Sequence, residues 1–375
     1  MNLGLYLHIP FCEHKCGYCD FYSAANIDHY GHTFVNALVK EIERTENTSA
    51  TCDTIFFGGG TPSLLSTSQL EKILNALHKH FSILPNTELT IETNPETVNL
   101  EKLKSFKSLG FNRISFGVQS FIDHELKFME RIHSADKAKE AITNARVAGF
   151  SNISLDLIFA LPDQTLDDWK YTLDQAITLN TDHISAYSLI FEKNTRFGQL
   201  VREQQITPKE QEEDRKFYEF TIQYLAKHGF TQYETSNYAT SESKQSKHNL
   251  KYWEMAPYLG FGPSAHSFDG IRTRHWNIRS TEKYIEKIES NTSAIINSEL
   301  LSGEDHMFEW IMLGFRMKKG IDLAHFNRRF GCSFAEKYSE SIIKFQDMGL
   351  IELTETHCKL TDEGVFYSDQ ISTYF

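Results

Sequence analysis

Short apolar runs alternate with longer segments of helical spacing over the first half of the chain. The short runs have the composition and length of buried strands, and six are predicted, at 3–8, 54–57, 88–93, 113–118, 152–159 and 183–189. Segments 68–81, 99–109, 135–148 and 166–179 are predicted as helices, and Gly110 and Gly149 are placed to cap two of them. This alternation predicts parallel strands joined by right-handed crossovers.

Each predicted strand finishes in a polar residue or an unusual motif. In chain order these are a cysteine loop, the Gly-Gly-Gly-Thr-Pro segment 58–62, Glu92, Gln119, Asp156 and Tyr187-Ser188. The carboxyl ends of parallel strands gather ligands, both in α/β barrels and in open, doubly wound sheets. Because six separate strand ends contribute, a ring fits better than an open sheet, and we predict an α/β fold with a partial (β/α)6 TIM-like barrel.

The second half of the chain changes its pattern. Residues 208–228 are predicted to form one more long helix, and residues 231–238 after it have the composition of a strand. Residues 241–297 are rich in aromatic residues, but their apolar positions follow a less regular period. From 302 on, predicted helices at 305–317, 323–330 and 334–348 precede short strands at 349–353 and 359–361, an order that resembles a winged helix. We therefore expect a barrel at 1–235, a joining region at 236–300 and a winged-helix-like α+β domain at 301–375.

The amino-acid composition and the net charge argue against several classes of protein. A chain of 375 residues with 40% hydrophobic and 23% charged residues can bury a large core, and it contains no apolar run long enough for a membrane span. No signal peptide precedes the first strand, so we expect a cytoplasmic protein whose six cysteines serve metals or reactions rather than disulfides. The net charge of −12 opposes a nucleic-acid partner.

The strongest chemical signal is a CxxxCxxC pattern, Cys12, Cys16 and Cys19, in the loop after the first strand. Three thiolates can bind three irons of a four-iron cluster and leave the fourth iron open. Thiolates also bind zinc, but a structural zinc site needs four ligands, and no fourth cysteine follows at a regular spacing. His14 could complete a zinc site, so the spacing alone leaves both metals and chance open. The other three cysteines show no ligand spacing.

This loop, with Tyr18 before its last cysteine, and the segment 58–62 resemble the radical S-adenosylmethionine enzymes over residues 3–270. Within that superfamily, Tyr-Leu-His-Ile-Pro-Phe-Cys at 6–12 and Gly-Gly-Gly-Thr-Pro-Ser at 58–63 are similar to one branch. That branch contains oxygen-independent coproporphyrinogen III oxidase and its haem-chaperone relative. The resemblance implies a 4Fe-4S cluster whose open iron binds S-adenosylmethionine, and a reducing electron donor such as a flavodoxin-like protein.

The resemblance also implies a set of cofactor-binding residues at the barrel mouth. Carboxylates can hold ribose hydroxyls or an ammonium group, and a guanidinium can hold a carboxylate, although each residue alone could be an ordinary capping or exposed side chain. Glycines at 58–60 would let the backbone approach a ligand, or would form a tight turn. The implied residues are Tyr6, Tyr18, Gly59, Gly60, Thr61, Glu92, Gln119, Arg131, Asp156, Ile190 and His266.

A second motif, His-Asn-Leu-Lys-Tyr-Trp at 248–253, resembles the hallmark of the haem-chaperone subgroup. A histidine beside large aromatic rings could be an axial haem ligand, which makes His248 a haem candidate. Without the resemblance, a hydrogen-bonded structural histidine is the simpler interpretation. The resemblance implies haem and a haem-accepting protein as partners, and it is compatible with a homodimer.

Two departures from the oxidase bear on activity. The oxidase has a further cysteine where this chain has Phe21, and a long N-terminal extension where only five residues precede Tyr6 here. Both argue against coproporphyrinogen oxidation. We therefore expect a haem chaperone with a 4Fe-4S cluster and exchangeable S-adenosylmethionine. The alternatives are the oxidase itself and a zinc-stabilised binding protein.

The winged-helix-like segment raises the question of DNA binding. Its predicted recognition helix, 334–348, mixes acidic and basic residues and carries no basic stripe. We expect it to pack against the barrel or against a protein partner.

Overall fold

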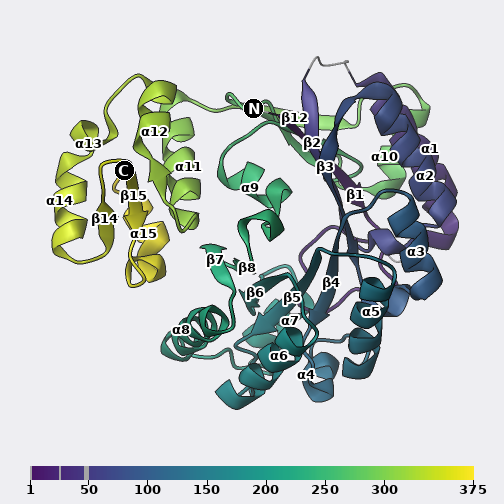
Figure 1. Ribbon diagram of the computed structural model, residues 1–375. Helices are drawn as coiled ribbons and strands as arrows, with labels where there is room; N and C mark the ends of the chain where they lie inside the picture. The colour runs from purple at the N-terminus through teal and green to yellow at the C-terminus, as the bar shows by residue number, and fades with distance from the viewer. Residues whose placement is uncertain (1, 25–26, 46–49) are drawn as a thin grey trace.

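The computed structural model describes residues 2–24, 27–45 and 50–375. Its centre is one curved sheet of twelve strands in the order β12-β11-β10-β9-β1-β2-β3-β4-β5-β6-β8-β7 (Figure 1). The first six strands in the sequence lie side by side and parallel, as predicted. They are β1 Leu3–Ile9, β2 Thr51–Gly59, β3 Ser82–Thr93, β4 Arg113–Gln119, β5 Ile153–Phe159 and β6 His183–Ser188.

Helices connect these strands and cover the outer face of the sheet (Figure 1). Local sequence sets their ends: Ser66 and Thr165 form capping boxes at the starts of α2 and α6, and Gly110 and Gly149 follow α3 and α5 with φ of 95° and 94°. The helices are α1 Ile27–Arg44, α2 Thr67–His80, α3 Leu100–Ser108, α4 Asp123–Phe128, α5 Ala135–Val147, α6 Leu166–Thr178, α7 Arg196–Arg202 and α8 Gln211–Lys227.

The predicted joining region extends the sheet. At one edge β7 (Thr231–Glu234) and β8 (Asn237–Ala239) form an antiparallel hairpin on β6. At the other edge β9 (Tyr258–Phe261) runs parallel to β1, and β10 (His266–Phe268), β11 (Thr273–Asn277) and β12 (Ile295–Leu300) follow antiparallel. In the described part of the chain β12 and β7 stand at the two ends of this strand order, which agrees with the predicted partial barrel. The hairpin of β7 and β8 crosses residue 235, and the division there stays a prediction.

The end of the chain forms a second, smaller unit with its own apolar core, against which Met255, Tyr258 and Phe268 of the preceding region also pack. Its three-stranded sheet has the order β13-β15-β14. The elements are α11 Gly303–Arg316, β13 Ile321–Asp322, α12 Leu323–Phe330, α13 Phe334–Lys337, α14 Ser339–Asp347, β14 Ile351–Leu353, β15 His357–Leu360 and α15 Ser368–Ser372. This mixture of helices and a small sheet agrees with the winged-helix-like expectation.

One predicted helix of this unit is wrong in its length. The segment 334–348 is two helices, α13 and α14, which meet at Tyr338. Tyr338 leaves the helical conformation with φ −111° and ψ 23°, and its ring lies 5.1 Å from the Phe334 ring and 5.2 Å from the Phe375 ring. Burial of this ring in the small core accompanies the break, which the periodicity of the segment does not reveal.

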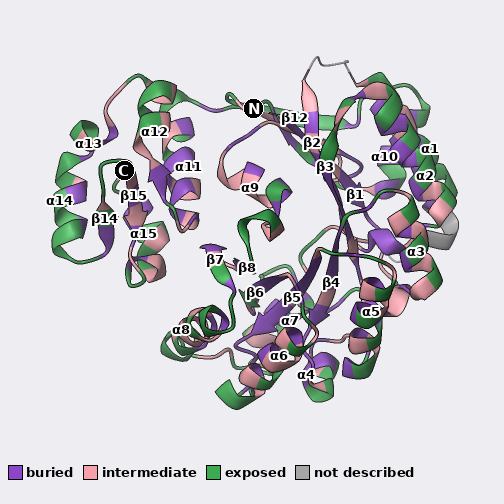
Figure 2. Cartoon of the chain, in the orientation of Figure 1, coloured by how far each residue is buried: buried purple, intermediate pink, exposed green. Residues whose placement is uncertain are grey.

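Two further helices lie on opposite sides of the sheet. α10 (Thr281–Glu289) packs against α1 in the outer layer, whereas α9 (Lys247–Trp253) lies on the inner side and contacts both β2 and α11. Figure 2 shows the strands mostly buried and the outward faces of the helices exposed. Within the described ranges, no helix has the length and hydropathy that crossing a membrane requires.

Candidate functional site

The cysteine loop leaves β1 and is tied down by backbone hydrogen bonds. Cys12 N–H donates to the Ala24 carbonyl at 3.1 Å, and Ala24 N–H donates to the Pro10 carbonyl at 2.6 Å, so the two ends of the loop lie side by side. Thr61 N–H also donates to the Phe11 carbonyl at 2.6 Å. The loop is therefore fixed to the glycine segment that follows β2.

The three thiols lie near one another in a partly buried place. Burial raises the pKa of Cys12 and of Cys19, and the neighbouring thiols, Cys16 among them, raise it further. The Thr61 hydroxyl donates to Cys12 Sγ at 3.6 Å, and this contact opposes the shift at Cys12. Thiolates in this place need a bound cation, because burial and mutual repulsion both disfavour their charge.

The donor set fits an iron–sulfur cluster. Among the residues the structure describes, no three His, Cys, Asp or Glu side chains are close enough together to hold one metal ion. In a cluster each thiolate binds a different iron, so its ligands need not converge on a single point. His14, the remaining candidate for a zinc site, lies 4.0 Å from the Glu130 carboxylate instead. Three soft thiolates without a fourth ligand suit a cluster with an open iron better than structural zinc.

Arg131 and Asn94 connect the cysteine loop to the strand ends. Arg131 donates from Nη1 to Cys16 Sγ at 3.5 Å, and from Nη2 to Asn94 Oδ1 at 2.7 Å and the Gly117 carbonyl at 2.8 Å. Asn94 in turn donates to Thr61 Oγ1 at 3.0 Å. The Nε of Arg131 is buried without a hydrogen-bond partner. The guanidinium thus faces the cluster loop and keeps one donor unused.

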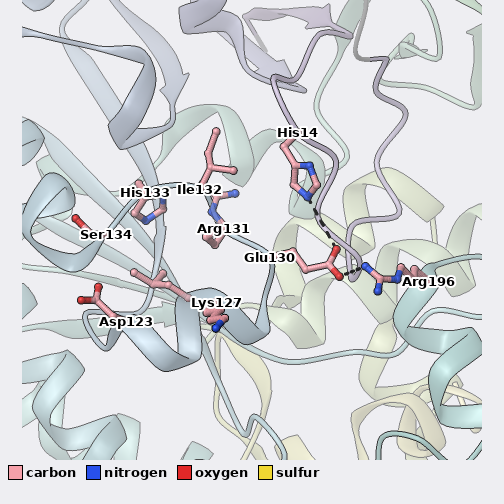
Figure 3. Close-up of a pocket in the computed structure, with 10 residues that line it drawn as sticks. His14, Asp123, Lys127, Glu130, Arg131, Ile132, His133, Ser134 and Arg196 are labelled. Carbon is pink, nitrogen blue, oxygen red and sulfur yellow. Dashed lines mark hydrogen bonds and ion pairs between the residues drawn. The ribbon is translucent and has the colours of Figure 1, made fainter.

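A cavity of about 530 Å³ opens beside this loop. Figure 3 shows His14 from the loop and Arg131 at its wall, with Glu130 between His14 and Arg196. Glu130 pairs with both of these basic side chains. The cavity wall therefore carries several charged side chains, and the cavity adjoins the cysteine loop directly.

Two partly buried carboxyl groups, Glu92 on β3 and Asp156 on β5, lie on strands that are separated by β4. Burial and the nearby Asp156 raise the pKa of Glu92 to about 8. Burial also raises the pKa of Asp156, although hydrogen bonds from Ser185 and Ser115 oppose this shift. Glu92 accepts a hydrogen bond from Gly59 N–H at 3.2 Å. A pair of partly buried carboxyl groups can be stabilised by protons or by the positive and hydroxyl groups of a ligand.

The glycine segment passes very close to its own chain. A Cβ on Gly59, whose φ is 104°, would lie 2.6 Å from the His8 ring, and one on Gly60 would lie 2.5 Å from the Phe11 carbonyl oxygen. Glycine is therefore required here by packing. The predicted approach of this backbone to a cofactor stays a prediction.

The His-Asn-Leu-Lys-Tyr-Trp motif forms α9, whose start is held by a buried carboxylate. Glu88 accepts hydrogen bonds from the backbone N–H groups of Lys247 and His248 at 3.2 and 3.1 Å. Lys251 donates to the Asn2 carbonyl at 2.8 Å and pairs with Asp53 at 2.7 Å. The motif therefore fastens α9 to the inner side of β1, β2 and β3.

His248 is the centre of this attachment. It is 1% exposed, its Nδ1 shares a hydrogen bond with Thr54 Oγ1, and its Nε2 shares one with Tyr252 Oη, both at 2.9 Å. Its ring stacks on Phe56 at 5.1 Å. Burial, with Lys251 nearby, lowers the pKa of His248 to about 3, so the imidazole is neutral. Both ring nitrogens are in use, which is the geometry of a structural histidine.

The other predicted cofactor residues fall into two groups. Tyr6 lies against the α9 attachment, with its hydroxyl 3.1 Å from His8 Nδ1, while Tyr18 and Gln119 lie near Arg131 and Gly117. Ile190 and His266 are exposed. In the described residues, neither of these two makes a hydrogen bond or ring contact with the cysteines, Glu92 or Asp156; His266 stacks on Trp276 at 5.6 Å.

Comparison with known proteins shows which family models and which relatives the chain matches. Residues 6–176 match the family model of the Radical SAM superfamily, and residues 301–367 match that of the HemN C-terminal domain. The protein named heme chaperone HemW of Bacillus subtilis (strain 168) is 36% identical, over 98% of this chain and 97% of its own length. The chain belongs to the HemW family.

Other relatives agree with this assignment. HemW of Escherichia coli (strain K12) is 35% identical to this chain, over 86% of the chain and 85% of the relative. The solved structure of coproporphyrinogen III oxidase (HemN) from Escherichia coli has a TM-score of 0.85 at 22% identity, and the match covers 100% of this chain and 89% of that one. The oxidase therefore shares the fold of this HemW family member, and the predicted branch of the radical SAM superfamily is confirmed.

The sequence did not single out two residues that organise the site. Asn94 comes two positions after Glu92, at the end of the same strand, and joins Arg131 to Thr61. Glu88 begins the predicted strand 88–93 and holds α9. A polar residue at a strand end was the signal that could have found Asn94, whereas the partners of Glu88 lie far away in the sequence.

Proposed function

We propose that this protein is a haem chaperone, which binds haem and passes it to an acceptor protein. The observation that carries the proposal is its similarity to curated heme chaperones over nearly the whole chain. The chain-wide match includes the cysteine loop, α9 and the C-terminal unit. A cytoplasmic location, a reducing electron donor and a homodimer belong to the same proposal as predictions.

We further propose that Cys12, Cys16 and Cys19 hold a 4Fe-4S cluster and that the barrel mouth binds exchangeable S-adenosylmethionine. When bound, the cluster supplies an open iron that can hold the cofactor. The protein's part is to fix the loop through its hydrogen bonds and to offer buried polar groups. Glu92 and Asp156 suit the cationic and hydroxyl groups of such a ligand, and the unused Nε of Arg131 suits a carboxylate.

Oxidation of coproporphyrinogen is the second candidate function, and the fold shared with HemN favours it. Phe21 opposes it, since the chain has an exposed ring where the oxidase resemblance calls for a cysteine. The two functions predict different results in one anaerobic experiment.

The experiment uses the full chain after anaerobic reconstitution with iron and sulfide. Haem is titrated in and followed by absorbance, and coproporphyrinogen III is then supplied with S-adenosylmethionine and a reductant. The chaperone proposal expects saturable haem binding and no protoporphyrinogen. Protein that carries the cluster but binds no haem overturns the proposal, and product formation in several turnovers replaces it with the oxidase.

A further inference from the structure

A second, smaller cavity lies between α9 and the C-terminal unit. It has a volume of about 150 Å³ and lies where Trp253, the last residue of the His-Asn-Leu-Lys-Tyr-Trp motif, faces α11, β13 and α12. Trp310, Lys319, His325 and His357 are among the residues that line it. The cavity is separate from the cysteine loop and from the cavity beside it.

Two of the residues that line the cavity have a buried hydrogen-bond donor without a partner in the described part of the chain. These donors are the indole Nε1 atoms of Trp253 and Trp310, and the Nε of Arg316, which contacts the Trp253 ring but does not line the cavity, has no partner either. Trp310 is only 6% exposed, and the Arg316 guanidinium lies over the Trp253 ring at 4.4 Å. Buried donors in folded proteins almost always have an acceptor, so two unpaired indole N–H groups in one cavity indicate that an acceptor is missing.

Two carboxylates, Glu254 and Asp322, line the cavity, and each accepts a hydrogen bond from another group. Glu254 accepts from Lys319 Nζ at 2.8 Å, and Asp322 caps α12 by accepting from the His325 backbone N–H at 2.8 Å. Burial lowers the pKa of His325, so its imidazole is neutral near pH 7. The two indole N–H groups still lack an acceptor oxygen, in a cavity that is lined by the tryptophan rings, Lys319 and these two carboxylates.

We propose that this cavity binds the carboxylate of a ligand, held by the indole N–H groups of Trp253 and Trp310. A carboxylate oxygen accepts from both donors, and charge-assisted hydrogen bonds of this kind are stronger than neutral ones. The volume suits a carboxylate with a short chain rather than a whole macrocycle. Resting on the proposed function, the source is a propionate of haem, which extends from a flat ring that the indoles can contact.

The four tryptophans of the chain allow a direct test by NMR. Protein labelled with ¹⁵N-tryptophan is titrated with sodium propionate, and the indole N–H signals are assigned by single Trp→Phe variants. Trp169 donates to Thr221 at 2.8 Å and Trp276 lies on β11, so both serve as references. The signals of Trp253 and Trp310 should shift together with saturation while the references stay. No shift of either signal means that water alone fills the cavity and overturns the proposal.

A second experiment identifies the source of the carboxylate. Haem and haem dimethyl ester, which has no free carboxylate, are titrated into wild type, Trp310→Phe and the control Tyr367→Phe, an exposed tyrosine of the same unit. Wild type and the control should bind haem about tenfold more tightly than the ester, a difference of about 1.4 kcal/mol, and Trp310→Phe should lose that preference. Equal affinity for haem and its ester in wild type overturns the haem propionate as the ligand.

The two experiments separate this proposal from the proposed function. If propionate shifts the two indole signals but haem does not bind, the carboxylate site stands and the haem-chaperone proposal fails. If haem binds while neither indole responds to haem or propionate, the chaperone proposal stands and the carboxylate site is refuted.

Discussion

The cysteine loop and α9 both contain sequence motifs, but the thiols of the loop have few interaction partners within the protein, whereas both ring nitrogens of His248 in α9 have one. In the loop, the Cys12 thiol accepts one long hydrogen bond from Thr61, and burial raises the pKa of Cys12 and of Cys19. In α9, the His248 ring has a partner at each nitrogen and is almost completely buried. The loop is chemically incomplete without a ligand, whereas His248 is complete without one.

This difference separates a ligand site from a structural anchor. A motif identifies residue types, but a residue can bind a ligand only if it has a donor, acceptor or metal-ligating atom that no other group of the protein already occupies. Within α9 itself, the buried side-chain atom without a hydrogen-bond partner is the Nε1 of Trp253, at the opposite end from His248. Trp253 is therefore a better candidate than His248 for the residue of the motif that binds a ligand.

The largest effect is expected at the cysteines. Changing Cys12, Cys16 or Cys19 to serine should abolish the iron–sulfur absorbance and reduce the iron retained after reconstitution to background, because each thiolate holds one iron. Iron and sulfide analysis after anaerobic gel filtration measures this. Cys332→Ser is the matched control and should retain the cluster, since Cys332 lies in the C-terminal unit. Retention of a full cluster by any of the three loop variants would refute their assignment as ligands.

The next effect concerns stability. His248→Ala should lower the free energy of unfolding by about 3 kcal/mol, because it opens a buried space and leaves Thr54 and Tyr252 without their partner. Urea denaturation of the apoprotein followed by circular dichroism measures it. Lys247→Ala, an exposed position on the same helix, should change stability by less than about 0.5 kcal/mol. A stable His248→Ala protein that has lost haem binding would instead restore His248 as a haem ligand.

The pH dependence of stability should follow from the same histidine. Its pKa in the folded protein is about 3, below the ordinary value of 6.5, so between these values the unfolded chain binds more protons than the folded one. The contribution of His248 is therefore complete above pH 6.5 and is lost as the pH falls toward 3.

Comparison with His248→Gln isolates this contribution, since other buried histidines act equally in both proteins. Below pH 6.5 the wild type should lose stability relative to the variant by about 1.4 kcal/mol per pH unit. Urea denaturation of both proteins at pH 7.5, 6.0 and 5.0 measures the difference. Parallel curves for the two proteins would show that the pKa of His248 is the same in the folded protein as in the unfolded chain.

The sequence predicted the parallel part of the fold well because its signals are local. Each of the six strands is a short apolar run of its own, and the glycines after α3 and α5 mark helix ends directly. The joining region was missed as part of the sheet, because β9 is only four residues long and pairs with β1 from the other end of the barrel domain. All six residues of β12 are exposed, so no apolar pattern marks that strand.

For the site, the sequence identified residue types but not their partners. The cysteines and Glu92 were singled out because thiols at regular spacing and a carboxylate at a strand end are unusual, and their roles stay predictions. The burial of His248 could not be read from its neighbours in the chain, since Thr54 and Glu88 come from other strands. Nor could sequence show that Trp253 and Trp310 share a cavity.

The smallest effect is expected at Phe21, beside the cysteines. Its ring is 68% exposed, so Phe21→Ser removes little buried apolar surface and should change the free energy of unfolding by less than about 0.5 kcal/mol. The cluster should also form to the same iron content, because backbone hydrogen bonds and Thr61 hold the loop without this side chain. Denaturation and iron analysis beside wild type measure both quantities. Loss of iron would show that the Phe21 ring packs over the bound cluster. The loop would then resemble α9, because a side chain of the protein, and not the ligand alone, would stabilise it.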